Sequence, residues 1–435
     1  MTDERVAALE SEAAGDPENP ARYRALAAAW RRQGAEAEAM AAELAATALE
    51  ARAPLALFNI ATACFSAGRR AEAKRWYALA LRLDPDLIVA HRNLAAILEA
   101  EGQLGEARRH RDEAYRRQSV FVEAATKVEA QRVLILAASG FGNVPIEALL
   151  PRATTTRITW FIDYAKDGEA ERLPPHDLVF NAAGDPDMAE ALLPEVWRFL
   201  ARRTAPLLNA PESVAETQRH LLPQRLAGIG DVVVPRVARV ARDALGDPGV
   251  AAAIGFPLIL RPIGAHGGAG VRLIDSAADL AAADLGEAEA CYLTAYCDYR
   301  SPDGYFRKYR VIFVDRAPYP YHLAISQHWL VHYFSADMLH PSWKRAEEAR
   351  FLADPAATLG RKAMAALAAI GRRLDLDFCG IDFTLDPAGK LLVFEANATM
   401  AVHLRDAAET FPYKHVHVPK IFEAFETMLA RRRVG

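Results

Sequence analysis

Three oxygen-bearing side chains, Asp382, Glu395 and Asn397, lie in two strand-like runs, residues 379–385 and 390–397. Carboxylate and amide oxygens suit a hard cation, and Mg²⁺ takes one or two carboxylates and completes its shell with water and substrate phosphates. The alternative is a solvated polar face, but the acids occur just where the apolar surface of the strands ends. The sequence therefore predicts a magnesium site on Asp382, Glu395 and Asn397.

The turn between the two runs sets which residues of the hairpin face one another. Residues 386–389 read Asp-Pro-Ala-Gly, a strong turn signal. If the hairpin closes there, Leu385 opposes Lys390 and Asp382 opposes Val393. Glu395 then lies diagonal to Asp382 on the same face, with Cβ atoms roughly 7–8 Å apart. We therefore expect both acids on one face of the sheet.

A glycine-rich loop follows an apolar strand-like run at residues 257–262, which ends in the cation Arg261. Bare backbone can approach a phosphate chain closely and donate its N–H groups to it. Arg261 would add charge-assisted hydrogen bonds to the same anion. A flexible hairpin turn is the alternative. The phosphate interpretation assigns nucleotide contacts to Arg261 and to four loop residues, His266, Gly267, Gly268 and Gly270.

A third strand-like pair completes the candidate chemistry. Residues 291–297 form an apolar run, and residues 308–314 form another after an intervening Gly/Asp loop. Arg310, on a strand beside the carboxylates, can meet a phosphate, although alone it would be an ordinary surface cation. We predict Arg310, Lys308 and Arg261 as the catalytic cations.

Residues 321–344 form a histidine-rich segment close to these runs. His328 and His332 have the spacing of one helix face, which would suit zinc, but no third ligand follows at a motif spacing. We therefore favour a substrate contact or a structural role for these histidines over a metal site.

The chain opens with a helical repeat. Glycines recur every 34 residues, and so do two sets of alanines. These positions are Gly34, Gly68 and Gly102; Ala39, Ala73 and Ala107; and Ala46, Ala80 and Ala114. Small residues at fixed offsets let two antiparallel helices approach closely, and glycine suits the turn between them. The pattern resembles the tetratricopeptide repeat, in three units at about 20–53, 54–87 and 88–121. Such arrays usually bind a peptide or protein; the alternative is that the array packs on the rest of the chain or forms a dimer.

Between the repeats and the candidate site, apolar strand-like runs alternate with a helical stretch. The runs are residues 133–137, 158–162, 177–181 and 207–209, with a helix expected at 186–202. Such alternation predicts a small parallel sheet. We therefore divide the chain into helical repeats at 1–128, an α/β domain at 129–210 and a nucleotide-binding and catalytic domain at 211–435.

The order of strand, cation, glycine loop, hinge, arginine strand and D…E-x-N resembles the ATP-grasp superfamily over about residues 131–430. That superfamily includes glutathione synthetases, D-alanine–D-alanine ligases and ribosomal-protein glutamate ligases. The resemblance implies a Rossmann-like domain before the ATP-grasp fold, ATP between two α+β lobes, and adenine near Ala295, Tyr296 and Cys297. It also implies Mg²⁺ on the predicted acidic site and a flexible phosphate loop at 264–270.

The chain departs from the superfamily at its two phosphate-binding lysines. Arg261 occupies the second position, and either Arg219 or His220 falls near the first. Arginine keeps the charge and adds a planar fork of donors, so a phosphate role survives. A histidine there would be only partly charged near neutral pH.

The resemblance implies an ATP- and Mg²⁺-dependent ligase that joins a carboxylate to an amine through an acyl phosphate, with the repeats recruiting a peptide or protein partner. Two alternatives stay open. One is a nucleotide-binding or catalytically dead scaffold that works through its repeats, and the other is a small-molecule kinase on the same fold. The kinase would yield a stable phosphorylated product instead of an amide.

Length and composition agree with a multidomain protein. The 435 residues are 52% hydrophobic and 25% charged, with a net charge of −4, which excludes a disordered chain and gives no support to nucleic acid as a partner. An apolar stretch long enough to span a membrane and an N-terminal signal peptide are both missing from the sequence. The four cysteines form no C-x-x-C pair. We therefore expect a cytoplasmic protein without membrane partners.

Overall fold

The computed structural model describes residues 2–140, 142–202, 204–264, 268, 270–286 and 288–434. The chain divides into two compact units, residues 1–119 and 120–435. Helices make up the described part of the first unit, and helices and strands alternate in the second. The predicted fold class, a helical array followed by α/β architecture, is confirmed.

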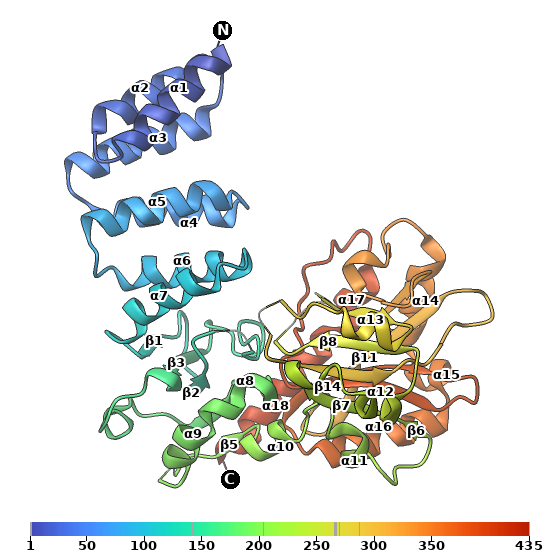
Figure 1. The fold of residues 1–435 in the computed structure, drawn as a ribbon. Helices are drawn as coiled ribbons and strands as arrows, with labels where there is room; N and C mark the ends of the chain where they lie inside the picture. The colour runs from blue at the N-terminus through green and yellow to red at the C-terminus, as the bar shows by residue number, and fades with distance from the viewer. Residues whose placement is uncertain are drawn as a thin grey trace. The chain divides into compact units, whose positions relative to one another are not determined.

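The first unit is a stack of helices that follow one another along the chain (Figure 1). Its described helices are α1 (Thr2–Gly15), α2 (Pro20–Arg32), α3 (Glu36–Glu50), α4 (Pro54–Ser66), α5 (Arg70–Leu83), α6 (Ile88–Ala100) and α7 (Leu104–Tyr115). The helix pairs α2–α3, α4–α5 and α6–α7 fall within the three predicted repeat units.

The 34-residue period has a direct structural basis in this unit. Gly34, Gly68 and Gly102 follow the first helix of each pair and have φ of 77°, 78° and 78°, a left-handed conformation that favours glycine. All six periodic alanines are fully buried between the helices. The helical repeat array is confirmed, while its identity as a tetratricopeptide array stays a prediction.

The second unit begins with a five-stranded sheet in the order β1-β3-β2-β4-β5. Its strands are β1 (Val120–Glu123), β2 (Gln131–Ala137), β3 (Thr155–Phe161), β4 (Leu178–Asn181) and β5 (Leu207–Leu208). The four strands β2, β3, β4 and β5 run parallel to one another, as predicted. β1 is antiparallel to β3 and is a strand that the sequence pattern did not indicate. The helix expected at 186–202 is broken into α8 (Pro186–Ala189) and α9 (Leu193–Leu200).

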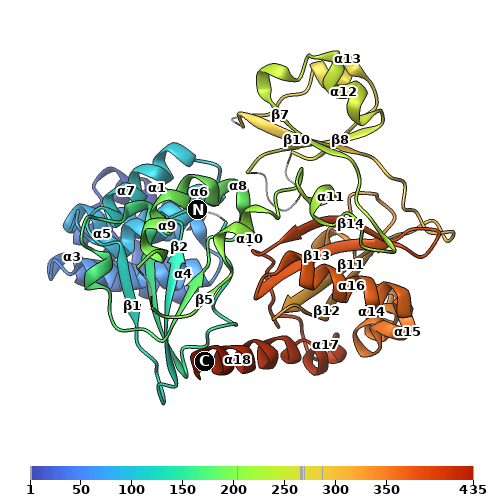
Figure 2. The same cartoon turned by 90° about the horizontal axis from the view of Figure 1, so that it is seen from below.

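Two further sheets carry the candidate site. An antiparallel sheet has the order β7-β10-β8-β9, and a mixed sheet has the order β12-β11-β13-β14-β6. The strands of the first are β7 (Val237–Ala241), β8 (Leu258–Pro262), β9 (Arg272–Ile274) and β10 (Ala290–Ala295). Those of the second are β6 (Val232–Val233), β11 (Phe306–Val314), β12 (Ala317–Ser326), β13 (Phe378–Leu385) and β14 (Leu391–Asn397). Figure 2 shows β7, β8 and β10 in one lobe and β11 to β14 in another.

Helices cover these sheets, and one of them joins two sheets. Besides α8 and α9, the described α-helices of the second unit are α10 (Pro211–Ala215), α11 (Leu222–Arg225), α12 (Pro248–Ile254), α13 (Ala277–Ala281), α14 (Ser342–Ala353), α15 (Pro355–Leu359), α16 (Arg361–Leu374), α17 (Pro412–His417) and α18 (Pro419–Val434). Phe425 of α18 contacts Phe180 of β4 and Phe378 of β13, with ring centroids 5.9 and 5.7 Å apart. α18 therefore ties the first sheet to the mixed sheet (Figure 2). Along the described stretches of the chain, every helix is too short or too polar to cross a membrane.

Candidate functional site

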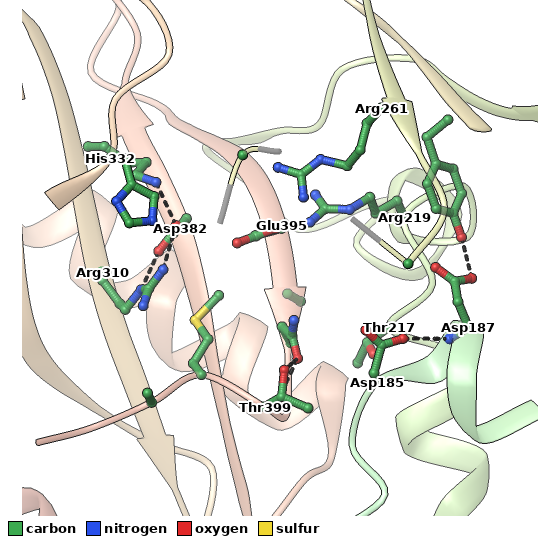
Figure 3. Close-up of a pocket in the computed structure, with 18 of the residues that line it drawn as sticks. Asp185, Asp187, Thr217, Arg219, Arg261, Arg310, His332, Asp382, Glu395 and Thr399 are labelled. Carbon is green, nitrogen blue, oxygen red and sulfur yellow. Dashed lines mark hydrogen bonds and ion pairs between the residues drawn. The ribbon is translucent and has the colours of Figure 1, made fainter. Parts of the chain in front are cut away.

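A cavity of about 580 Å³ brings together side chains from several separate segments of the second unit (Figure 3). Its walls come from β8, β10, β11, β13 and β14, and from the segment that follows β4. The polar side chains among its described lining residues are Asp185, Asp187, Thr217, Arg219, Arg261, Tyr292, Lys308, Arg310, His332, Ser335, Asp382, Glu395, Asn397 and Thr399. Most of the residues predicted from the sequence therefore meet in one place.

The two predicted carboxylates are direct cross-strand neighbours. Asp382 on β13 pairs with Glu395 on β14, whereas the sequence analysis placed Val393 opposite Asp382. That predicted register is wrong for two physical reasons. The hairpin closes at Leu385 and Leu391, one residue further along than expected, and a β-bulge at Phe394 adds one residue to β14.

Specific contacts hold this register. At the turn, Asp386 Oδ1 accepts hydrogen bonds from the backbone N–H groups of Ala388 and Lys390, at 2.9 and 2.8 Å. At the bulge, the ring of Phe394 packs against Tyr299, with centroids 4.9 Å apart. Directly opposed residues such as Asp382 and Glu395 have Cβ atoms roughly 4.5–5.5 Å apart, which is closer than the separation of roughly 7–8 Å expected for a diagonal pair.

Each carboxylate is held by cations, which come from β11 and from the turn between α10 and α11. Arg310 makes a bidentate contact with Asp382, Nε to Oδ1 at 2.6 Å and Nη2 to Oδ2 at 2.9 Å. Lys308 Nζ lies 3.0 Å from Asp382 Oδ2, and Arg219 pairs with Glu395. Figure 3 shows Arg310 beside Asp382, with Arg219 and Arg261 on the other side of Glu395. The acids thus lie between two groups of cations.

These cations control the ionisation of the site. Burial alone raises the pKa of Asp382, but Arg310 and Lys308 hold it well below its usual value. Burial also raises the pKa of Glu395, but Arg219 outweighs it and the pKa falls to about 2. Burial, together with Arg219, lowers the pKa of Arg261 to about 10. Both acids are therefore ionised at neutral pH.

The depressed pKa of Glu395 predicts a pH dependence of stability. Its pKa is about 2 in the folded chain against a usual 4.5, so its contribution is present above pH 4.5 and is lost as the pH falls towards 2. We expect the wild type to unfold with a higher free energy than Glu395→Gln at about pH 6, and the difference to shrink by about pH 3. Urea unfolding at both pH values measures this; a constant difference would contradict it.

A mostly apolar pocket of about 130 Å³ adjoins the main cavity. The described residues that line both are Arg219, Arg261, Tyr292, Lys308, Leu330, Val331, Asp382 and Glu395. The predicted hinge residues Ala295, Tyr296 and Cys297 all line this pocket. Its other described apolar residues are Leu222, Val234, Pro235, Val237, Ile259, Val271, Tyr299, Trp329, Leu330, Val331 and Phe394. A flat apolar group that carries an anionic tail fits this pair of cavities.

The structure separates the two candidates for the first phosphate-binding position. Arg219 lines both cavities and pairs with Glu395. His220 stacks on the ring of Tyr292, with centroids 6.0 Å apart, and burial lowers its pKa. Of the two candidates, Arg219 therefore lies in the wall of both cavities, while its role as a phosphate-binding residue stays a prediction.

The glycine-rich loop is only partly described. Gly264 and Gly268 line the main cavity, and Gly268 has a φ of 84°. Gly270 packs on Pro262, where an added Cβ would lie 3.1 Å from Cγ. The predicted contacts His266 and Gly267 lie outside the described residues.

The cavity also contains a polar pair that sequence reasoning missed. The hydroxyl of Tyr292 on β10 donates to Asp187 Oδ1 at 2.5 Å, and burial raises the pKa of Asp187. The two residues are 105 positions apart, so no motif spacing connects them. Thr399 was also missed: its N–H and Oγ1 both donate to Asn397 Oδ1 at 2.6 Å, which fixes the amide of that predicted ligand.

The histidine-rich segment is not helical where a helix face was considered. β12 ends at Ser326, residues 327–330 form bends, and Val331 and His332 belong to neither a helix nor a strand. The interpretation that His328 and His332 lie on one face of a helix is therefore wrong. Within the described part of the chain, His, Cys, Asp and Glu side chains form no group of three that could hold a metal ion. His332 instead lines the main cavity near Asp382 (Figure 3).

Comparison with known proteins gives matches among solved structures. Protein-family models and curated proteins give no match. The D-alanine–D-alanine ligase from Bacillus anthracis in complex with ATP is 13% identical, with a TM-score of 0.43, and the match covers 70% of this chain and 99% of that chain. A RimK domain protein ATP-grasp from Sphaerobacter thermophilus is 16% identical, with a TM-score of 0.41, covering 68% and 98%.

Proposed function

We propose that this chain is an ATP- and Mg²⁺-dependent carboxylate–amine ligase that works through an acyl-phosphate intermediate. The observation that carries the proposal is the cross-strand pair Asp382–Glu395, flanked by cations in a cavity that adjoins an apolar pocket. ATP needs cations and a metal for its phosphates and an apolar slot for its base. The main cavity offers the cations, and the adjoining pocket offers the apolar slot.

The donor set fits Mg²⁺. Asp382, Glu395 and the amide of Asn397 carry hard oxygen atoms on neighbouring strands of one hairpin, and Arg219 pairs with Oε2 of Glu395. These three residues would hold the Mg²⁺, whose positive charge would offset the negative charge of the phosphates.

The cations of the cavity have roles at both chemical steps. In the first, a carboxylate oxygen of the acid attacks the γ-phosphorus, the bond to the β–γ bridging oxygen breaks, and ADP leaves. In the second, the amine nitrogen attacks the acyl carbon and loses a proton, and phosphate leaves. Arg219 and Arg261 bind and orient the phosphates, while Lys308 and Arg310 hold the acid and stabilise the oxyanion.

The helical array of the first unit has a recruiting role in this proposal. Its repeats would bind a peptide or protein that carries one of the two substrates. The support is the confirmed 34-residue helical period, whose buried small residues allow close stacking of the helix pairs.

Binding of nucleotide is tested by thermal unfolding with ATP and Mg²⁺, and with ATP and a chelator. Ligand at about 100 times its dissociation constant should stabilise the native state by roughly 2.7 kcal/mol. We expect ATP and Mg²⁺ to raise the unfolding midpoint of the wild type and of Asp275→Asn, a control at an exposed carboxylate. In Asp382→Asn, the part of this rise that depends on the metal should be lost. The absence of any shift in the wild type would contradict the proposal.

A nucleotide-binding scaffold is the second candidate, because Arg219 and Arg310 already neutralise both carboxylates by ion pairs. Release of ADP separates the two candidates. A panel of acids and amines that produces ADP supports the ligase, whereas metal-dependent binding without ADP under any partner condition supports the scaffold.

A further inference from the structure

A small side pocket of about 110 Å³ adjoins the main cavity. The two share Lys308, Arg310, His332, Phe334 and Ala401. The remaining described lining of the side pocket is Tyr321, His322, Tyr333, His403 and Lys414. A ligand that occupies both pockets therefore passes the side chains of Lys308 and Arg310.

Polar side chains make up most of the described wall of the side pocket, together with Phe334 and Ala401. Its charged residues, among those described, are all cations: Lys308, Arg310 and Lys414. The carboxylates that pair with these cations, such as Asp382 and Asp406, are not part of its described lining. Such a wall favours a group that accepts hydrogen bonds and carries negative charge.

A buried network holds this wall in place. Lys414 on α17 is 4% exposed, and its Nζ donates to Asp406 Oδ2 at 3.0 Å and to the hydroxyl of Tyr333. Tyr333 and Tyr413 donate in turn to the fully buried Glu348, at 3.0 and 2.6 Å. Lys414 and Tyr333 are thus fixed before any ligand arrives, which lowers the entropic cost of binding.

In two imidazoles of the pocket, one buried ring nitrogen has no hydrogen-bond partner among the described residues. His322 is 6% exposed and lies opposite Arg310 in the sheet, and its Nδ1 has no hydrogen-bond partner among the described residues. The same holds for Nδ1 of His403. Burial lowers the pKa of both histidines, so each is neutral and carries one ring N–H. Buried polar atoms of this kind are usually satisfied by a ligand or by water.

We propose that the side pocket binds a second carboxylate of the acid substrate, so that the ligase acts on a small dicarboxylic acid. One carboxylate reacts beside Arg310 in the main cavity, and the other is bound by His322, His403 and Lys414. The volume of the side pocket admits a carboxylate and the carbon that bears it, and the residues shared with the main cavity require a short link between the two groups. This inference rests on the proposed function.

Histidine NMR of the full chain tests the inference without substitution. The chain, labelled with ¹⁵N-histidine, is titrated with succinate, glutarate and butyrate, with and without ADP and Mg²⁺. We expect the dicarboxylates to shift the ring nitrogens of His322 and His403, and butyrate to leave them unchanged. Equal shifts with butyrate or with inorganic phosphate would overturn the inference, because the pocket would then be a general anion site.

Calorimetry with variants adds a second readout. His322→Gln and His403→Gln should each weaken dicarboxylate binding by about 10- to 100-fold, as expected for hydrogen bonds to a charged group. His340→Gln, at a side chain that is 79% exposed, should bind as the wild type does.

The two proposals fail in different ways. Stabilisation by ATP and Mg²⁺ without any dicarboxylate effect on His322 would overturn the inference and leave the ligase standing. Dicarboxylate binding without nucleotide stabilisation would contradict the ligase, and with it the assignment of the pocket to a ligase substrate.

Discussion

Replacing Glu395 by glutamine should lower the rate of ADP release on the order of 10²–10³-fold, the usual effect of removing one group that stabilises transition-state charge. The expected cause is loss of one of the two cross-strand carboxylates that would hold Mg²⁺ opposite the cations of the cavity. Glutamine keeps the shape of the side chain and one acceptor oxygen for Arg219, so the fold should survive. Turnover is measured as ADP release once an active pair of acid and amine is found.

The control for this variant is Glu409→Gln, which removes the same charge at an exposed position. We expect turnover of the control to equal that of the wild type. Undiminished turnover of Glu395→Gln would end the assignment of this carboxylate to the metal site, and equal losses in both variants would point to a general effect of charge.

Replacing Gly371 by alanine should destabilise the second unit by about 1–3 kcal/mol or more, as overpacking does. Gly371 lies where α16 crosses the β11–β12 turn, and an added Cβ would stand 2.1 Å from the carbonyl oxygen of Arg316 and 2.7 Å from Cδ1 of Phe313. Alanine favours a helix over glycine by about 1 kcal/mol, which is too little to offset this clash with backbone. Native-state hydrogen exchange of the slowest amides in β11 and α16 measures the loss.

Gly105→Ala in α7 is the matched helical substitution. An added Cβ at Gly105 meets no atom within 4 Å among the described residues. We therefore expect a gain of roughly 0.5–1 kcal/mol in the first unit from the lower entropy of the unfolded chain. If the α16 amides of Gly371→Ala were as protected from hydrogen exchange as those of the wild type, the close approach of α16 to the β11–β12 turn would be contradicted.

The helical repeats were predictable because their signal is local and periodic. Each first helix of a pair needs a residue with positive φ at its end, and each contact between helices needs a small side chain. Gly68 and Ala73 meet these needs, and the same types recur at each 34-residue step. The apolar strand runs were predictable for a similar reason, since a buried strand must be apolar over its own short length.

The register of the acidic hairpin could not be read from its residues. A bulge at Phe394 changes the pairing, and the bulge is favoured by packing against Tyr299, which belongs to a different segment. The choice between Arg219 and His220 was equally undecided in the sequence. It depends on which side chain faces Glu395, 176 residues away from Arg219.

The sequence by itself therefore determined the order of the elements, the residue types of the acidic site and the cations on the strands beside it, because each follows from local periodicity or from a short motif. Only the tertiary structure decided that Asp382 faces Glu395 directly, that Asp187 meets Tyr292, and that His322 and Lys414 share one pocket. These contacts join segments far apart in the chain. Their geometry depends on how whole sheets and helices pack, which no spacing of residues along the sequence specifies.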